Sequence, residues 1–373
     1  MAGGEYAYEV LNLADGRRTA QDIRNAVSAT YGPIQLDVVV EYLGALGSIR
    51  VIEAVRVTLA GSVRCFQQPK GAMRMKSRAI CLALLLASFA ITIKAQERKI
   101  KIYISADMEG VVGVVTNEQL GPQGFEYARF REFMTQEVNA AIEGALEAGA
   151  TEIIVSDSHG NGQNLLIEKL PKNILLVRSW PRPLMMMQGI DETFAGVIFI
   201  GYHTGTTNPQ GVRAHTMSSA RLADVRLKGV SVSEAGINAA IAGHFNVPVI
   251  MVSGDDAVVK ETTGLLGDVE GAVVKWASGF HSAKTLMPEA AYQLIREKVK
   301  KAIGRIKDFK PYKLATPIQL DVRFKNYRPS EVLSYLSIVE RTDAHSIRFT
   351  GRDMIEVSKF LEFIMTYEPS LEP

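Results

Sequence analysis

Four short apolar runs, each followed at once by a polar cluster, constrain the fold of this chain more than any other feature. They span residues 101–105, 151–156, 196–201 and 248–253, with the sequences KIYIS, TEIIVS, GVIFIG and PVIMVS. Runs rich in valine and isoleucine that alternate with helical stretches predict buried parallel strands. Ligands of an open parallel sheet bind beyond the carboxyl ends of its strands. The four clusters are therefore expected at one edge of one sheet.

These clusters hold most of the residues able to bind a metal ion. They are Asp107 and Glu109, then Asp157 and His159, then His203, and finally Asp255 and Asp256. Three of the six histidines, His159, His203 and His215, lie in or just after the clusters. A single cluster is explained equally well by the polarity of loops that follow strands. Four together favour a hydrolytic metal site.

The spacing of the carboxylates favours a shared cation. Asp107 and Glu109 stand two residues apart just after a strand, where alternation directs both side chains to the same side. Asp157 is a candidate to orient the ring of His159. Glu234 follows the predicted helix cap Ser233, where a carboxylate also has the simpler role of stabilising the helix dipole.

Two imidazoles and three carboxylates are more ligands than one open tetrahedral zinc ion accepts. They suit a pair of divalent ions about 3.5–4 Å apart with a bridging water, in which one carboxylate joins both ions.

Composition and motifs exclude several other classes of function. The net charge is +2, and no stretch interleaves basic with aromatic residues, so no nucleic-acid partner is expected. Both cysteines, Cys65 and Cys81, precede residue 97, which excludes a cysteine nucleophile or a thiolate zinc site downstream. No G-x-S-x-G, Walker, H-E-x-x-H or G-x-G-x-x-G motif is present.

Residues 73–96 have the parts of an export signal. An apolar run, Ala79–Ile93, follows Arg74, Lys76 and Arg78 and ends before Lys94-Ala95-Gln96. It is short for a membrane span. Because 72 residues precede it, we expect translation to start at Met73 or Met75; an internal signal anchor and a buried core helix are the alternatives. The protein is expected to be exported if the signal is used and otherwise membrane-anchored, with no other contact to a membrane.

Residues 1–72 are predicted to form a small helical segment. Thr19 caps one helical pattern, Tyr31-Gly32-Pro33 ends it, and Leu36–Leu46 forms a second. Residues 1–57 resemble the winged-helix-like modules related to PqqD, through this apolar pattern and D-G-x-R-T. A helical tail of an unrelated upstream protein is the alternative.

The remaining chain is predicted to be α/β. Residues 97–310 alternate strand and helix, which indicates a largely parallel sheet with helices on both faces. Residues 311–373 change to strand, helix, strand and helix, which predicts a smaller C-terminal α+β domain.

Five motifs in this chain together resemble one enzyme family. They are S-A-D-M-E-G (105–110), S-D-S-H (156–159), G-Y-H (201–203), R-A-H-T-M (213–217) and S-E-A-G-I-N (233–238). In order and spacing they are similar to those of the zinc-dependent D-aminopeptidases of the DppA type, peptidase family M55. The resemblance spans residues 100–370 and includes G-D-D (254–256).

The resemblance implies a function and a site. Asp107, Glu109, His159, His203 and Glu234 would hold two zinc ions, with Asp107 as the bridge, and His215 would be the catalytic histidine. The substrate would be a short D-amino-acid-containing peptide or amide cleaved at its N-terminal bond, and the assembly a ring-shaped homo-oligomer. Hydrolysis of another bond, such as an L-peptide, another amide or a phosphoester, stays an alternative, as do another divalent metal and a non-catalytic binding protein.

Overall fold

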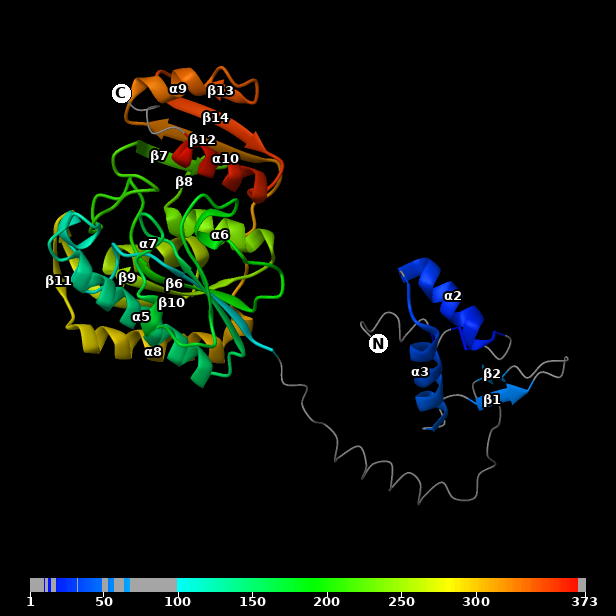
Figure 1. Cartoon of the computed structure of the whole chain (residues 1–373). Coiled ribbons are helices and arrows are strands. Elements are labelled where there is room, and N and C mark those ends of the chain that lie inside the picture. The colour runs from blue at the N-terminus through cyan, green and yellow to red at the C-terminus, as the bar shows by residue number, and fades with distance from the viewer. Residues whose placement is uncertain are drawn as a thin grey trace. The chain divides into compact units, whose positions relative to one another are not determined.

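The protein has two compact units, Met1–Gln96 and Glu97–Pro373. The computed structural model describes residues 10, 13–14, 18–31, 33–48, 53–56, 64–67 and 99–367 (Figure 1). The expected export segment, residues 73–96, lies outside them. Within the described ranges, no helix is long and apolar enough to cross a membrane.

The first unit contains both predicted helices. Its elements are α2 (Ala20–Tyr31), α3 (Leu36–Ser48) and the antiparallel strands β1 (Glu53–Arg56) and β2 (Arg64–Gln67). Thr19 caps α2, since its Oγ1 accepts from the backbone N of Asp22 at 3.2 Å while its own N donates to the Asp22 carboxylate at 2.9 Å. A small apolar cluster that includes Val27 and Leu43 joins the helices.

The main sheet of the second unit has seven strands and is parallel except for its last strand. They are β3 (Lys101–Ala106), β4 (Glu152–Asp157), β5 (Leu175–Val177), β6 (Gly196–Tyr202), β9 (Val249–Asp255), β10 (Glu270–Gly279) and β11 (Ser282–Thr285). Their spatial order is β11-β10-β9-β6-β3-β4-β5. All four apolar runs are strands of this sheet, which confirms the predicted α/β class. After β3 the chain adds β4 and β5 on one side of it and then β6, β9 and β10 on the other side. The point where the strand order reverses, the switch point of the sheet, therefore lies between β3 and β6.

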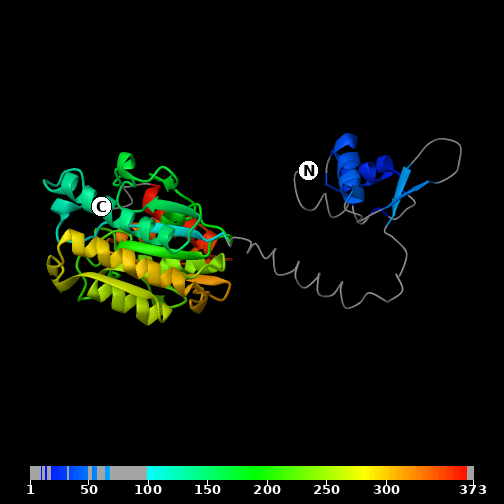
Figure 2. The same ribbon diagram turned by 90° about the horizontal axis from the view of Figure 1, so that it is seen from below.

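Helices cover both faces of the main sheet. On one face α5 (Tyr127–Glu147) packs on α8 (Pro288–Gly304), and Figure 2 shows α8 in yellow in front of the strands. The two backbones approach closely at Gly144, where a Cβ atom would stand 2.6 Å from the carbonyl oxygen of Arg296. On the other face lie α6 (Glu234–His244) and α7 (Asp256–Leu266). Residues 234–243 of α6 are all buried, which its many alanines and glycines permit.

A second, antiparallel sheet forms a further layer beyond α6 (Figure 1). In spatial order its strands are β13 (Val339–Arg341), β14 (Ser346–Gly351), β12 (Ile318–Phe324), β7 (Leu222–Leu227) and β8 (Val230–Ser231). Helix α9 (Tyr327–Leu333) follows β12, and α10 (Met354–Thr366) packs between this sheet and α6. Between residues 99 and 367 the unit also has four 3₁₀ helices: η1 (Asn117–Gln119), η2 (Ile167–Lys169), η3 (Met185–Met187) and η4 (Ile306–Asp308).

The C-terminal sheet is not built from C-terminal residues alone. Residues 311–373 supply β12, β13 and β14, whereas β7 and β8 come from the segment between β6 and α6. A domain boundary at residue 310 stays a prediction, but the hydrogen bonds between β7 and β12 cross it.

Candidate metal centre and active site

The six residues singled out in the sequence lie together at the carboxyl edge of the main sheet. Asp107 and Glu109 follow β3, His159 follows β4, His203 follows β6, Glu234 begins α6, and His215 lies in the segment between β6 and β7. The five expected metal ligands are all buried, with exposed fractions of 1–8%. The switch point of the sheet therefore carries a closed group of carboxylates and imidazoles.

The two oxygens of Asp107 face two different histidines. Its Oδ1 lies 3.2 Å from His159 Nδ1, and its Oδ2 lies 3.3 Å from His203 Nε2. Glu109 Oε2 is 2.9 Å from the same nitrogen of His159, and Glu234 Oε1 is 3.5 Å from that of His203. Asp107 is thus the common member of two clusters.

Backbone carbonyls orient all three imidazoles. His159 Nε2 lies 2.7 Å from the oxygen of Leu120, His203 Nδ1 lies 3.0 Å from that of Thr204, and His215 Nδ1 lies 2.8 Å from that of Arg213. Because a carbonyl only accepts, each of these nitrogens donates, and the other ring nitrogen of each histidine faces the carboxylates.

Asp157 does not orient the His159 ring, contrary to the expectation from sequence. Its Oδ2 accepts from the backbone nitrogens of Asn164 and Leu165 at 2.6 and 2.7 Å, and its Oδ1 accepts from Asn164 Nδ2 at 2.8 Å. The same Nδ2 also donates to the carbonyl of His159 at 2.6 Å. Asp157 therefore shapes the loop that carries His159, while the Leu120 carbonyl holds the ring.

The geometry of the cluster fits metal ions. Asp107, Glu109 and His159 form one group whose ligand atoms lie within 4.8 Å of one another, and Asp107, His203 and Glu234 form another. Asp107 Oδ2 and His203 Nε2 are buried, and neither has a hydrogen-bond partner among the described residues. Buried polar atoms without partners are costly, so two that face each other across 3.3 Å are compatible with a cation bound between them.

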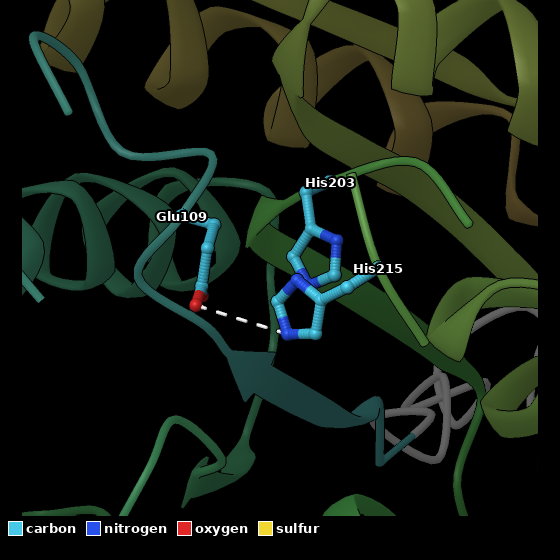
Figure 3. A group of neighbouring side chains, drawn as sticks. All are labelled: Glu109, His203 and His215. Carbon is cyan, nitrogen blue, oxygen red and sulfur yellow. Dashed lines mark ion pairs between the residues drawn. The ribbon is translucent and has the colours of Figure 1, made fainter. Parts of the chain in front are cut away.

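His215 completes a third group with Glu109 and His203 (Figure 3). Its ring stacks on that of His203 with centroids 4.1 Å apart and planes inclined by 9°. Its Nε2 is 4.0 Å from Glu109 Oε1 and 3.7 Å from Glu234 Oε1. His215 is thus within reach of the ligand carboxylates while its side chain stays partly exposed to the adjoining cavity.

The buried carboxylates and imidazoles alter one another's ionisation. Burial, together with the neighbouring charge of Glu109, raises the pKa of the Asp107 carboxyl. Burial also opposes ionisation of Glu109, but the positive charge of His159 outweighs it and holds the pKa of Glu109 well below its usual range. The site therefore favours ionised carboxylates only where a cation stands beside them.

A buried lysine that the sequence did not single out supports the loop after β3. Lys275, fully buried on β10, donates through Nζ to the carbonyls of Glu109, Val111 and Val114. Burial lowers its pKa to about 8. From α5, Glu137 accepts from Val112 N at 2.8 Å. The one sequence signal for this role is a lysine inside an otherwise apolar strand, V-V-K-W.

The fourth polar cluster does not join the metal group. Asp255 Oδ1 caps α7 by accepting from Val258 N, and its Oδ2 accepts from Val212 N, both at 2.7 Å. Asp256 Oδ1 accepts from Ala277 N at 2.9 Å. These carboxylates are committed to backbone nitrogens because the strand passes directly into a helix. Asp255 thereby positions the segment that carries His215, and neither carboxylate belongs to a ligand group among the described residues.

A cavity of about 230 Å³ opens on the cluster. Asp107, Glu109, His159, His215 and Glu234 form its floor, and its walls include Trp180, Met186, Met217, Met365 and Glu362. Glu362 comes from α10, so the second layer of the unit helps to enclose the site. A small chamber with a floor of carboxylates and imidazoles and partly apolar walls suits one short side chain next to a reacting polar bond.

Comparison with known proteins agrees with this geometry. The family model of peptidase family M55, described as D-aminopeptidase, matches residues 100–363. The D-aminopeptidase of Bacillus subtilis (strain 168) is 35% identical over 260 residues, which cover 69% of this chain and 93% of that protein. A solved structure described as the Zn-dependent D-aminopeptidase DppA from Bacillus subtilis, a self-compartmentalizing protease, superposes with a TM-score of 0.69 at 33% identity. That match covers 72% of this chain and 97% of the solved chain. The chain therefore belongs to the M55 family of peptidases, the D-aminopeptidases.

Proposed function

We propose that this peptidase is a binuclear zinc aminopeptidase that removes the N-terminal residue from short peptides or amides containing D-amino acids. One observation carries the proposal: two three-ligand groups share Asp107, whose two oxygens face His159 and His203. An anionic carboxylate between two ligand sets is the arrangement that a pair of divalent ions needs. The Zn-dependence of the similar Bacillus protein supports zinc as the metal.

The residues have separate roles in this proposal. Glu109 and His159 would hold one ion, His203 and Glu234 the other, and Asp107 both. Zinc bound there would supply Lewis acidity for the scissile carbonyl and lower the pKa of a bound water to about 7. The carbonyls of Leu120 and Thr204 fix the ring orientations of His159 and His203, which would leave His159 Nδ1 and His203 Nε2 to bind the metal.

His215 is assigned the proton-handling role. Its Nδ1 donates to the Arg213 carbonyl, so its Nε2 faces the ligand carboxylates with a lone pair free to accept a proton. Once protonated, the same nitrogen can donate a hydrogen bond to the oxyanion that forms at the substrate carbonyl, or return the proton to the leaving amine.

Metal removal and restoration test the function. We expect the purified protein to release p-nitroaniline from D-alanine p-nitroanilide, to stop after chelation, and to recover when zinc is added back. The L-alanine substrate and a phosphoester, measured in parallel, test the bond and the handedness. If zinc-loaded protein cleaves only the L-substrate, the D-preference is wrong; if it cleaves only the phosphoester, the aminopeptidase assignment is wrong.

Two further properties belong to the proposal. We infer export, because residues 73–96 have the composition of a signal sequence. A ring-shaped homo-oligomer enclosing the sites is supported by the description of the similar Bacillus structure as self-compartmentalizing.

A further inference from the structure

A second cavity meets the active site at His215. It measures about 470 Å³, and its lining includes Asn117, Asn208, Arg213, His215, Phe280 and Lys325. His215 lines this cavity as well as the one over the metal ligands. The first cavity has a carboxylate floor, whereas the second contributes Arg213 and Lys325 and no carboxylate. The proposed proton donor therefore stands between a negatively charged chamber and a positively charged one.

Arg213 carries a buried charge without a balancing ion pair. Arg213 is 8% exposed, and no carboxylate oxygen among the described residues lies within ion-pair distance of its guanidinium. Its contacts are neutral: Nη2 donates to the Asn117 side chain, and the guanidinium lies 4.8 Å from the centre of the Phe280 ring. Its Nε is buried and has no hydrogen-bond partner among the described residues. A guanidinium has five N–H donors, and among the described residues only one donor of Arg213 has an acceptor.

The backbone holds Arg213 at this place. Its φ of 56° lies in the left-handed region, which is uncommon for a residue with a Cβ atom. Its N donates to the Phe280 carbonyl at 3.0 Å, and its own carbonyl accepts from His215 Nδ1 at 2.8 Å. Such strained positions persist where surrounding contacts enforce them and are concentrated at functional sites. The same residue thus orients His215 with its backbone and lines the second cavity with its side chain.

We propose that Arg213, with Lys325 at the edge of the cavity, binds the C-terminal carboxylate of a short peptide whose scissile bond lies at His215. This inference rests on the proposed function and adds a substrate class to it: peptides with a free carboxylate close behind the cleaved bond, above all dipeptides. A guanidinium pairs with a carboxylate through two parallel hydrogen bonds, which an amide-capped substrate cannot accept with the same strength. The simpler alternative to carboxylate binding is that Arg213 only balances the negative charge of Glu109, because the Glu109 carboxylate attracts the Arg213 guanidinium.

Kinetics on matched substrates test the proposal. We expect wild-type protein to prefer D-Ala-D-Ala over D-Ala-D-Ala amide in kcat/KM by about 10- to 100-fold, the usual range for a hydrogen bond to a charged group. In Arg213→Gln this preference should fall to near one, mainly through KM, and Arg213→Lys should restore part of it. Arg348→Gln removes the same charge outside both cavities and should keep the wild-type ratio. A wild-type ratio near one, or an Arg213→Gln ratio equal to that of wild type, would overturn the proposal.

Binding separates this inference from the proposed function. Zinc-loaded His215→Ala protein, titrated calorimetrically with D-Ala-D-Ala and with its amide, should bind the free carboxylate form at least about 10-fold more tightly. The double variant His215→Ala, Arg213→Gln should bind both forms equally. Equal binding of the two peptides to His215→Ala would refute carboxylate recognition even if the wild-type enzyme is active. If His215→Ala discriminates between the two peptides while zinc-loaded wild-type protein cleaves neither, the carboxylate site is supported and the aminopeptidase function is rejected.

Discussion

At the scale of single residues, Asp107 and His215 have different positions in the site and are therefore expected to have different roles. Asp107 is 2% exposed and is the only described residue shared by the two groups that contain His159 and Glu234. His215 is more accessible and lies where two cavities meet. One residue is placed to hold cations and the other to meet substrate, which a pair of substitutions can separate.

Replacing each of these two residues should have different effects on zinc and on turnover. Asp107→Ala removes an oxygen from both ligand groups, so we expect loss of most bound zinc, measured by elemental analysis after gel filtration. His215→Ala leaves both groups intact and should keep its zinc while kcat falls by about 10²–10⁴-fold, the range for a lost acid–base group. Zinc loss in His215→Ala would instead make this histidine a ligand, as its grouping with Glu109 and His203 permits. Full kcat in that variant would show that His215 has no chemical role.

At the scale of elements, the strand ends could be predicted from sequence and several of their contacts could not. The runs before Asp107, Asp157, His203 and Asp255 are short, apolar and β-branched, so their identity as buried strands is local information. The hydrogen-bond partners of the polar residues are not local. Asp255 accepts from Val212, 43 positions away, and His159 donates to a carbonyl 39 positions away. Side chains of the same chemical type thus became a helix cap at one strand end and metal-site residues at another.

The different role of the fourth strand end leads to a test. Asp255→Ala should lower the free energy of unfolding by about 2–3 kcal/mol, because the change removes the cap of α7 and leaves buried Val212 N without its acceptor. Denaturant unfolding measures the loss. Zinc content should stay at the wild-type value, since Asp255 lies in none of the ligand groups among the described residues. Ser218→Ala, which removes only the bond to Arg221 N, is a milder control. A drop in zinc stoichiometry without a loss of stability would return Asp255 to the list of ligands.

At the scale of the whole molecule, the main sheet was predictable, whereas the membership of the second sheet was not. Alternating strand and helix up to residue 310 is a pattern of adjacent segments. The pairing of β7 with β12 joins residues nearly a hundred positions apart. The sequence of a six-residue strand such as β7 does not indicate which sheet the strand will join. The structural roles of Lys275 and Arg213 could not be predicted for a related reason. Each role depends on groups that distant elements contribute.

The export proposal makes a prediction at the same scale. Among the described residues, the large apolar core is built from residues between Ile102 and Ile364, and the apolar cluster of the first unit is built from that unit's own residues. A product cleaved after the export segment would therefore keep its entire core. N-terminal sequencing of protein expressed from its native gene should give a mature start near Gln96 or Glu97. Retention of residues 1–72 in that protein would refute cleavage.

The origin of β7 and β8 has a consequence for how this architecture can change over time. Because the antiparallel layer takes two strands from mid-chain and three from the end, no single cut yields it as a transferable module. A gene fusion or a premature stop near residue 310 would strip β12 from β7 and remove Glu362 from the wall of the chamber. The two layers must therefore be kept together in any truncation or transfer of this unit.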